Sequence, residues 1–490
     1  MQKLKSLFGA QDMTVGKPLR SILLFTVPLL LGNVAQLLYN TVDSIIVGQY
    51  CGPNGLAATG VSMPIQFMFA VFFMTVGTGV SVMVAQYFGA KDKDNLSKTV
   101  GNSMILILGA TLLSTILGLL LSRWILEVTK CPPEVFDQAY DYLFIMFLGF
   151  VGMGFYNILG GILRGFGDST FPLVVLIGCT ILNIFLDIWM VADSTQLSFG
   201  LGLGVAGAAW ATIIAQTLSA VACLWRLLRM KHIVEVKKST LKLDKHIVQT
   251  IVRIGLPSGI QQMVMSFSFV LVQSIINGIQ IPFNGVMDGA IFVACNTAVM
   301  KVDGFAMMPA QTFNQASSTF VGQNIGAGKL DRCSKGLRQC LIIAVSVSLV
   351  VFAVIQIWGG GLMRMFINDP DPERSAKIIE VGIQMMRIMC YGYIMMAVSM
   401  TIGGAMRGAG DTMVQMWITL ITNIVIRLPL TYFMVHLSKS DEYPNGKPSM
   451  VFYSMLIGFG LNTAFTAIYF ATGRWKTKAV VKRPVMAIEE

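Results

Sequence analysis

Four polar side chains recur at intervals of three and four residues within an apolar stretch near the start of the chain: Asn33, Gln36, Asn40 and Asp43. At about 100° per residue they fall within a sector of roughly 80° on a helix. Tyr39 borders this stripe one turn before Asp43. A lipid-facing position would cost several kcal/mol for each unsatisfied group, so we expect the stripe to face protein or water.

A second carboxylate, Asp187, follows Asn183 by four residues in LNIFLDI, so both side chains project from one face of a helix. If Asp187 meets Asp43, the two carboxylates disfavour simultaneous ionisation until a proton or a cation arrives. Sodium is a hard cation that suits oxygen ligands. Thr212 offers a hydroxyl, and Ala208, one turn earlier, offers a carbonyl. These residues predict a cation site that loads and unloads.

The elements that must position these residues are membrane-spanning helices. The chain is 54% hydrophobic and 12% charged, with a mean hydropathy of +0.68, whereas about a quarter of the residues of a soluble domain are charged. Eleven charge-free runs are long enough to cross roughly 30 Å of hydrocarbon, and a twelfth from Thr412 is interrupted only by Arg427. The longest run contains the turn signal CGPNG at 51–55, and another extends from Ile254 to Met287. We therefore predict an all-α membrane protein with twelve transmembrane helices.

An internal repeat divides these helices into two halves. VAQYFGAKD from Val84 aligns with VGQNIGAGK from Val321 at a spacing of 237, and ILRGFGDST from Ile162 aligns with AMRGAGDTM from Ala405 at 243. LNIFLDI aligns with TNIVIRL at 240. Because six is even, both halves enter from the same membrane face. We expect two pseudo-symmetric six-helix lobes, related as parallel repeats, around a central cleft that takes the substrate.

The repeat also predicts the domain limits and two hinges. We expect a cytoplasmic N-terminal segment at 1–20, an N-lobe at 21–226, a basic cytoplasmic linker at 227–247, a C-lobe at 248–472 and a cytoplasmic tail at 473–490. In the matching loops, Arg164 can pair with Asp168 and Arg407 with Asp411 across a glycine turn. We interpret both loops as structural hinges.

The basic residues predict the orientation. Of the 36 Lys and Arg residues, 25 lie on the side of the N-terminus and seven on the opposite side, so both termini should be cytoplasmic in a multi-pass plasma-membrane protein. An anionic leaflet accounts for these charges, which excludes nucleic acid as the expected partner. The chain has no C-x-x-C pair and shows no paired-histidine, metal or Ser-His-Asp pattern, so we expect no enzyme activity and no cofactor. Cys51 and Cys131 share the outer side and could pair.

The segments NTVDSIIVG, VAQYFGAKD, VGQNIGAGK, RGFGDS, RGAGDT and GVAGAAWATIIAQ together resemble the multidrug and toxic compound extrusion (MATE) family, from about Leu19 to Thr472. The resemblance implies a cation-coupled exporter whose two six-helix lobes alternate between inward and outward openings. In archaeal and related members an aspartate of helix 1, an Asn and Asp of helix 5 and a threonine of helix 6 form an N-lobe site for sodium, protons or both. The matching residues are Asp43, Asn183, Asp187 and Thr212.

The C-lobe departs from part of that family, because its helices 7 and 10 contain no acid for a second sodium site. It carries Lys301, Asp303, Arg387 and Arg427 instead, and the repeat maps Arg427 onto Asp187. We infer a fixed ion pair of Asp303 with Arg427 or Arg387, with Lys301 released toward the cleft. Alternatively, all four charges only neutralise one another; otherwise the cleft is positive and accepts anionic or zwitterionic compounds.

The sequence thus predicts a secondary active exporter of drugs or metabolites that exchanges a small organic substrate for Na⁺ or H⁺ by alternating access. We expect a monomer whose partners are that substrate and membrane lipid. A lipid-linked oligosaccharide flippase of the same superfamily is the alternative, and it should carry more cleft cations and additional helices. A channel would lack the coupling that two switchable carboxylates supply. The residues expected in the substrate cleft or in coupling are Gln36, Tyr39, Asn40, Lys301, Asp303 and Arg427.

Overall fold

The computed structural model describes residues 9–195, 198–237, 240–367 and 370–481, and they are mainly helical. The helices of the first half are α2 (Pro18–Ala90), α3 (Lys93–Val128), α4 (Pro133–Leu148), α5 (Phe150–Gly165), α6 (Thr170–Val191) and α7 (Gly204–Arg229). The second half contains α8 (Lys245–Gly278), β1 (Ile281–Phe283), β2 (Val286–Asp288), α9 (Gly289–Gly326), α10 (Leu330–Arg364), α11 (Pro372–Gly408), α12 (Thr412–Leu420), the π-helical η1 (Ile421–Ile426), α13 (Arg427–Leu437), α14 (Ser449–Ala471) and the short 3₁₀ helix η2 (Arg474–Thr477).

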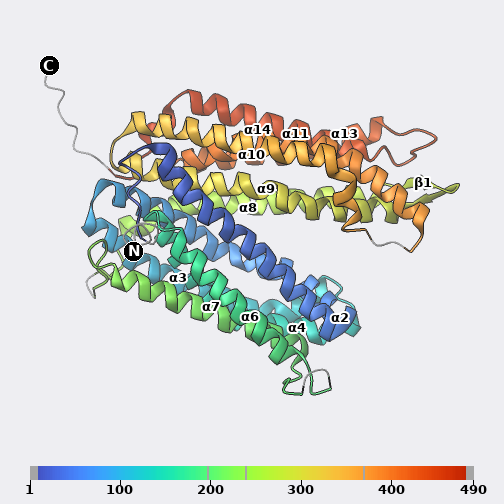
Figure 1. The fold of residues 1–490 in the computed structure, drawn as a ribbon, viewed down its shortest axis with the longest axis horizontal. Helices are drawn as coiled ribbons and strands as arrows, with labels where there is room; N and C mark the ends of the chain where they lie inside the picture. Colours follow the sequence, from blue (N-terminus) through green and yellow to red (C-terminus); the bar gives the residue numbers. More distant parts are fainter. Residues whose placement is uncertain (1–8, 196–197, 238–239, 368–369, 482–490) are drawn as a thin grey trace. The chain divides into compact units, whose positions relative to one another are not determined.

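The helix α2 provides two membrane spans. Its 73 residues would extend about 110 Å if straight, several times the hydrocarbon thickness. Gly52 interrupts the helix with φ 70° and ψ −168°, directly before Pro53 and inside the predicted turn signal, and Figure 1 shows the two arms of α2 in shades of blue. The sequence CGPNG therefore does reverse the chain, through one glycine conformation and not through a longer loop.

The described residues contain ten apolar helices long enough to span a membrane, and the pair α4 and α5, bent by 51°, adds one more span. Since α2 accounts for two, six spans lie in α2–α7 and six in α8–α14. The predicted twelve helices in two halves are confirmed. Many large apolar side chains on these helices are exposed, as suits a lipid-facing surface, Leu120 and Ile357 by 73% each.

The apolar run from Ile254 to Met287 extends beyond the end of its helix. The helix α8 ends at Gly278, and β1 and β2 form an antiparallel hairpin in which Ile281 pairs with Asp288. Asn284 and Gly285 at its turn have φ values of 50° and 77°. Asn-Gly is the preferred dipeptide for a turn with two positive φ angles, so it ends the apolar run as a hairpin.

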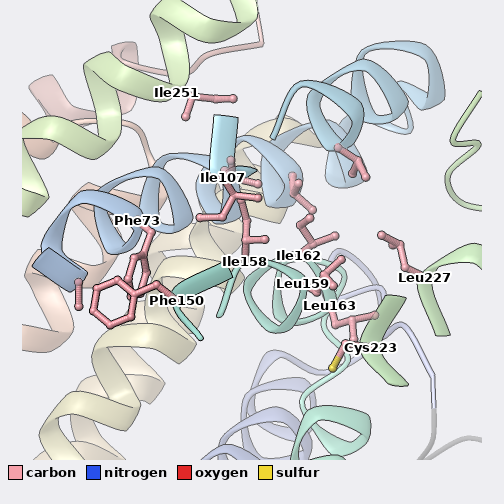
Figure 2. Packing of buried hydrophobic residues seen from close by; sticks show 14 of the residues in the cluster. Phe73, Ile107, Phe150, Ile158, Leu159, Ile162, Leu163, Cys223, Leu227 and Ile251 are labelled. Atoms are coloured by element: carbon pink, nitrogen blue, oxygen red, sulfur yellow. The ribbon is translucent and has the colours of Figure 1, made fainter. Parts of the chain in front are cut away.

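The described residues form two compact units. Residues 9–259, 322–329 and 479–481 belong to the first unit, and Ile260–Val321 and Leu330–Lys478 form the second. The core of the first unit is built by side chains of all helices from α2 to α8, some of which are labelled in Figure 2. The rings of Phe69, Phe147 and Phe150 pack edge to face at its centre, with centroid distances of 5.1 and 5.0 Å. In the second unit, α8, α9, α10, α11, α13 and α14 contribute to a separate core around Phe292 and Tyr393.

The two hinge loops have matching glycines but not the predicted ion pairs. Gly167 and Gly410, 243 residues apart, both adopt positive φ, 82° and 92°. However, Asp168 pairs with Arg226 at 3.3 Å, and Asp411 accepts a hydrogen bond from a tyrosine of α14. Pairing within each loop was therefore a wrong prediction, because the neighbouring helix supplies the partner of each aspartate.

The matching ends of α2 and α9 meet within the first unit. A Cβ built on Gly89 would lie 1.9 Å from the carbonyl oxygen of Gln323, and one built on Gly326 would lie 1.9 Å from that of Gln86. The Gln323 side chain accepts a hydrogen bond from the Met13 amide and donates one to a carbonyl at the end of α5. At the matching position, Gln86 accepts one from the amide of residue 480. The two terminal segments thus bind to equivalent glutamines.

Candidate functional site

The first unit brings ionisable and polar groups of three helices together. Asp43 and Tyr39 come from the first arm of α2, Asn183 and Asp187 from one face of α6, and Thr212 from α7. Asn183 and Asp187 are completely buried, Tyr39 and Thr212 are less than a tenth exposed, and Asp43 is half-buried. Helical spacing explains this grouping, because residues four apart share a face.

The two carboxyl groups face each other. The carboxyl groups of Asp43 and Asp187 lie close to one another and to Tyr39. Both oxygens of Asp187 and Oδ1 of Asp43 are buried without a hydrogen-bond donor among the described residues. Carboxylates only accept hydrogen bonds, so the pair can share one proton or one cation but is costly when doubly charged.

Tyr39 links this pair to α7. Its hydroxyl donates a hydrogen bond to Oγ1 of Thr212 at 3.2 Å, so one lone pair of Thr212 is engaged. Ala208 is completely buried in the second turn of α7, where its carbonyl belongs to the helical hydrogen-bond pattern.

The donor set suits a hard cation or a proton. Besides the carboxyl oxygens, both the oxygen and the nitrogen of the Asn183 amide are buried without a partner among the described residues. A cation that accepted Asp43, Asp187 and the Asn183 oxygen as ligands would satisfy these groups at once. Among the described residues, no group of three or more His, Cys, Asp or Glu side chains could hold a metal ion. The set thus suits sodium or a proton better than a transition metal.

Three polar side chains around the carboxyl pair were not predicted. Tyr142 of α4 is buried near Asp43, Asp187 and Gln66. Gln216 of α7 lies within reach of the Tyr39 hydroxyl. Gln216 follows Thr212 by one turn, a spacing that could have identified it, whereas Tyr142 and Gln66 stand in apolar runs and give no such signal.

The other polar residues of the stripe on α2 are more exposed than Tyr39. Asn40 is exposed and Gln36 is half-buried, and Gln36 donates a weak hydrogen bond of 3.4 Å to Asn40.

The predicted ion pair of the second half is not formed. Asp303 of α9 accepts a hydrogen bond from Tyr393 of α11, and no cation lies in salt-bridge range of Asp303 within the described ranges. Arg387 is exposed on α11, and Arg427 at the start of α13 is 4% exposed and hydrogen-bonds Asn423. The pair fails because Tyr393 takes the carboxylate instead.

The two remaining sequence predictions concern Lys301 and the cysteines. Lys301 is exposed, and its ammonium group lies 5.7 Å from the centre of the Phe366 ring. Cys51 and Cys131 are both free thiols, so the disulfide considered from sequence is not formed.

Known proteins resemble this chain along nearly all of its length. The MatE family model matches residues 28–189 and 257–433, more than half of the chain. The Probable multidrug resistance protein YpnP of Bacillus subtilis is 26% identical over 95% of this chain and 98% of that protein. The Probable multidrug resistance protein NorM of Thermotoga maritima is 25% identical over 95% of this chain and 94% of that protein.

Solved structures share the fold. A MOP superfamily transporter from Pyrococcus furiosus, described with "reverse polarity of binding pocket", matches with a TM-score of 0.83 and 22% identity over 95% of this chain and 97% of that one. The outward-facing conformation of a multidrug resistance MATE family transporter matches with a TM-score of 0.82 and 22% identity over 97% and 99%.

Proposed function

Because the chain belongs to the MatE family of membrane transporters, we propose that it exports small organic compounds in exchange for sodium ions or protons by alternating access. The observation that carries this proposal is the carboxyl pair Asp43 and Asp187, whose buried oxygens lack donors among the described residues. An intramembrane carboxylate is a functional candidate by default, and a facing pair can change its charge by binding one cation.

In this proposal Asp43 and Asp187 bind the coupling ion, the Asn183 oxygen is a further ligand, and Thr212 and Ala208 complete the sodium site. Loading neutralises the repulsion between the carboxylates, whereas unloading restores it. A ligand shifts a conformational equilibrium only by its difference in affinity for the two states. The loaded and unloaded pair should therefore favour different access states.

One coupling charge suffices energetically. A single charge that crosses 100 mV releases about 2.3 kcal/mol, which supports a substrate gradient of somewhat under fiftyfold before the ion's own concentration gradient is added. The twelve spans of the described residues include no additional helices of the kind expected for the flippase alternative.

The remaining sequence predictions belong to this proposal. We infer a plasma-membrane monomer with both termini in the cytoplasm and the lobe limits given above. The residues assigned to substrate or coupling in it are Gln36, Tyr39, Asn40, Lys301, Asp303 and Arg427.

The test is transport by the full chain in liposomes with sodium and proton gradients imposed separately, using the cationic dye rhodamine 6G. Asp43→Asn and Asp187→Asn should be folded and stable in detergent as the wild type is, but they should lose gradient-driven export. Asp137→Asn, a change of an exposed aspartate on α4, is the matched control and should export as the wild type does. Uphill export by the Asp43→Asn and Asp187→Asn double variant at the wild-type rate would refute the proposal.

A further inference from the structure

Arg427 is a buried cation that lacks an anionic partner in the described part of the second unit. Its side chain is 4% exposed. Its guanidinium carries five N–H donors, yet the hydrogen bond found for it runs from Nη1 to Oδ1 of Asn423 at 3.3 Å, and Nε is buried without an acceptor. A buried charge is costly unless it is paired and hydrogen-bonded. The arrangement therefore calls for an acceptor that the described residues do not supply.

The surroundings of Arg427 hold the guanidinium in place without neutralising it. The aliphatic part of the side chain packs against Gly458 of α14, where a Cβ would lie 3.2 Å from its Cδ. The guanidinium carbon lies 6.0 Å from the centre of the Phe459 ring. Asn423 is fixed in turn, because its amide nitrogen donates to the carbonyl of Thr419 at 3.1 Å. These contacts fix the orientation of the donors in advance.

The backbone at this point is irregular in the way that functional sites often are. The π-helical segment η1 lies between α12 and α13 and ends directly before Arg427. Single π-helical turns occur frequently at functional sites in α-helices. Asn423 lies inside this segment, so both members of the Asn423 and Arg427 pair depend on it.

The repeat gives this pair its meaning. Asn423 and Arg427 occupy the positions that Asn183 and Asp187 occupy in the first half, 240 residues earlier. In the first unit, buried carboxyl oxygens lack a donor, and in the second unit a buried guanidinium lacks an acceptor. Equivalent helix positions thus lack a hydrogen-bond donor in the first unit and an acceptor in the second.

We propose that Arg427 binds a carboxylate group of an organic anion or zwitterion, and that compounds of this class are substrates of the transporter. A planar guanidinium can bind both oxygens of a carboxylate, which is the strongest form of such a hydrogen-bonded pair. The substrate assignment rests on the proposed export function. The binding assignment does not, because it concerns a site in the second unit that exists whether or not an ion is coupled.

The test measures thermal unfolding of the purified full chain with potassium 2-naphthoate, with the neutral isostere 2-naphthamide and with potassium chloride. Naphthoate should raise the wild-type unfolding midpoint more than naphthamide or chloride does. Arg427→Met should lower naphthoate affinity by about tenfold to a hundredfold, as expected for hydrogen bonds to a charged group. Arg387→Met removes an exposed cation of the same unit and should leave naphthoate binding unchanged.

A second readout separates binding from a structural role. If Arg427 serves a ligand, Arg427→Met removes an uncompensated buried charge and should raise the midpoint of the ligand-free protein. A lowered midpoint, an equal response to naphthoate and naphthamide, or a response to chloride as large as that to naphthoate would each overturn the proposal. If Arg427→Met does not fold, Asn423→Ala tests the same proposal, because it should weaken the binding of naphthoate and leave the response to naphthamide unchanged.

The two proposals fail in different ways. If ion-coupled export is wrong, the wild type transports neither rhodamine 6G nor naphthoate against a gradient, while naphthoate binding still depends on Arg427. If the carboxylate site is wrong, rhodamine 6G export still depends on Asp43 while naphthoate binding ignores Arg427.

Discussion

The crossing of α2 and α9 at Gly89 and Gly326 should be the position most sensitive to a single added methyl group. Each glycine faces the backbone carbonyl of the other helix, and a Cβ on either would lie 1.9 Å from that oxygen. Ordinary contacts between carbon and a carbonyl oxygen are about 3.3 Å or longer. Gly89→Ala therefore forces the two helix ends apart by more than ~1 Å, because a backbone carbonyl cannot rotate away as a side chain can.

The expected cost follows from two opposing effects. Overpacking a well-packed contact costs about 1–3 kcal/mol and occasionally more, whereas Gly→Ala within a helix gains up to about 1 kcal/mol of intrinsic propensity. Gly60 of the same helix is exposed and has no atom within 4 Å of its added Cβ, so Gly60→Ala should show the gain alone. The propensity gain is common to both variants, so we expect the unfolding free energies of Gly89→Ala and Gly60→Ala to differ by the overpacking cost, roughly 1–3 kcal/mol.

Denaturant unfolding of the purified full chain in one detergent measures this difference. Gly326→Ala should resemble Gly89→Ala, and the double variant should cost less than the two single changes together, because both methyl groups enter the same gap. Equal unfolding midpoints for Gly89→Ala and Gly60→Ala would show that the helix ends do not cross this closely and would refute the reasoning.

Three further predictions concern the carboxyl site, the terminal segment and pH. Tyr39→Phe removes the hydrogen bond to Thr212, worth about 1 kcal/mol, so about fivefold more coupling cation should be needed for half-maximal export. Gln323→Ala removes two buried hydrogen bonds to backbone groups, worth about 1 kcal/mol each, and should lower the unfolding midpoint. Hydrogen bonding, mainly from Lys237, lowers the pKa of Glu235 to about 2 from an ordinary 4.5. A depressed pKa stabilises the fold at pH values above the ordinary pKa, and this stability is lost as the pH falls through the lowered pKa. The difference in unfolding midpoint between wild type and Glu235→Gln should therefore be constant above pH 4.5 and vanish as the pH falls toward about 2.

Much of the fold could be predicted because its determinants are periodic. The length of the apolar runs gave the number of spans, and the spacing between LNIFLDI and TNIVIRL gave the two halves. The hairpin after α8 was missed because Ile281–Phe283 is as apolar as the helix before it. There the Asn284 and Gly285 turn decides the structure, and a count of charges does not detect it.

The candidate site could be predicted only in part. The polar stripe identified Asp43 and the four-residue spacing placed Asn183 and Asp187 on one helix face, but only the resemblance to known transporters grouped them with Thr212 in one site. The partner of Asp303 could not be predicted, because charge complementarity favours an arginine, whereas the rotation of each helix decides which group lies within reach. Tyr393 lies within reach, and its hydroxyl is carried by a ring that a hydropathy pattern counts as apolar.

The amide four residues before each ionisable group explains how one repeat can carry opposite charges. An asparagine side chain has both an acceptor oxygen and a donor nitrogen, so it can serve a cation or an anion without being replaced. In the second unit, Asn423 directs its oxygen toward Arg427 and its nitrogen to a carbonyl. In the first unit, both atoms of Asn183 are unpaired among the described residues, so its oxygen can turn toward a cation held by Asp187. A change of one ionisable residue therefore inverts the polarity of the site while the surrounding helix geometry is kept.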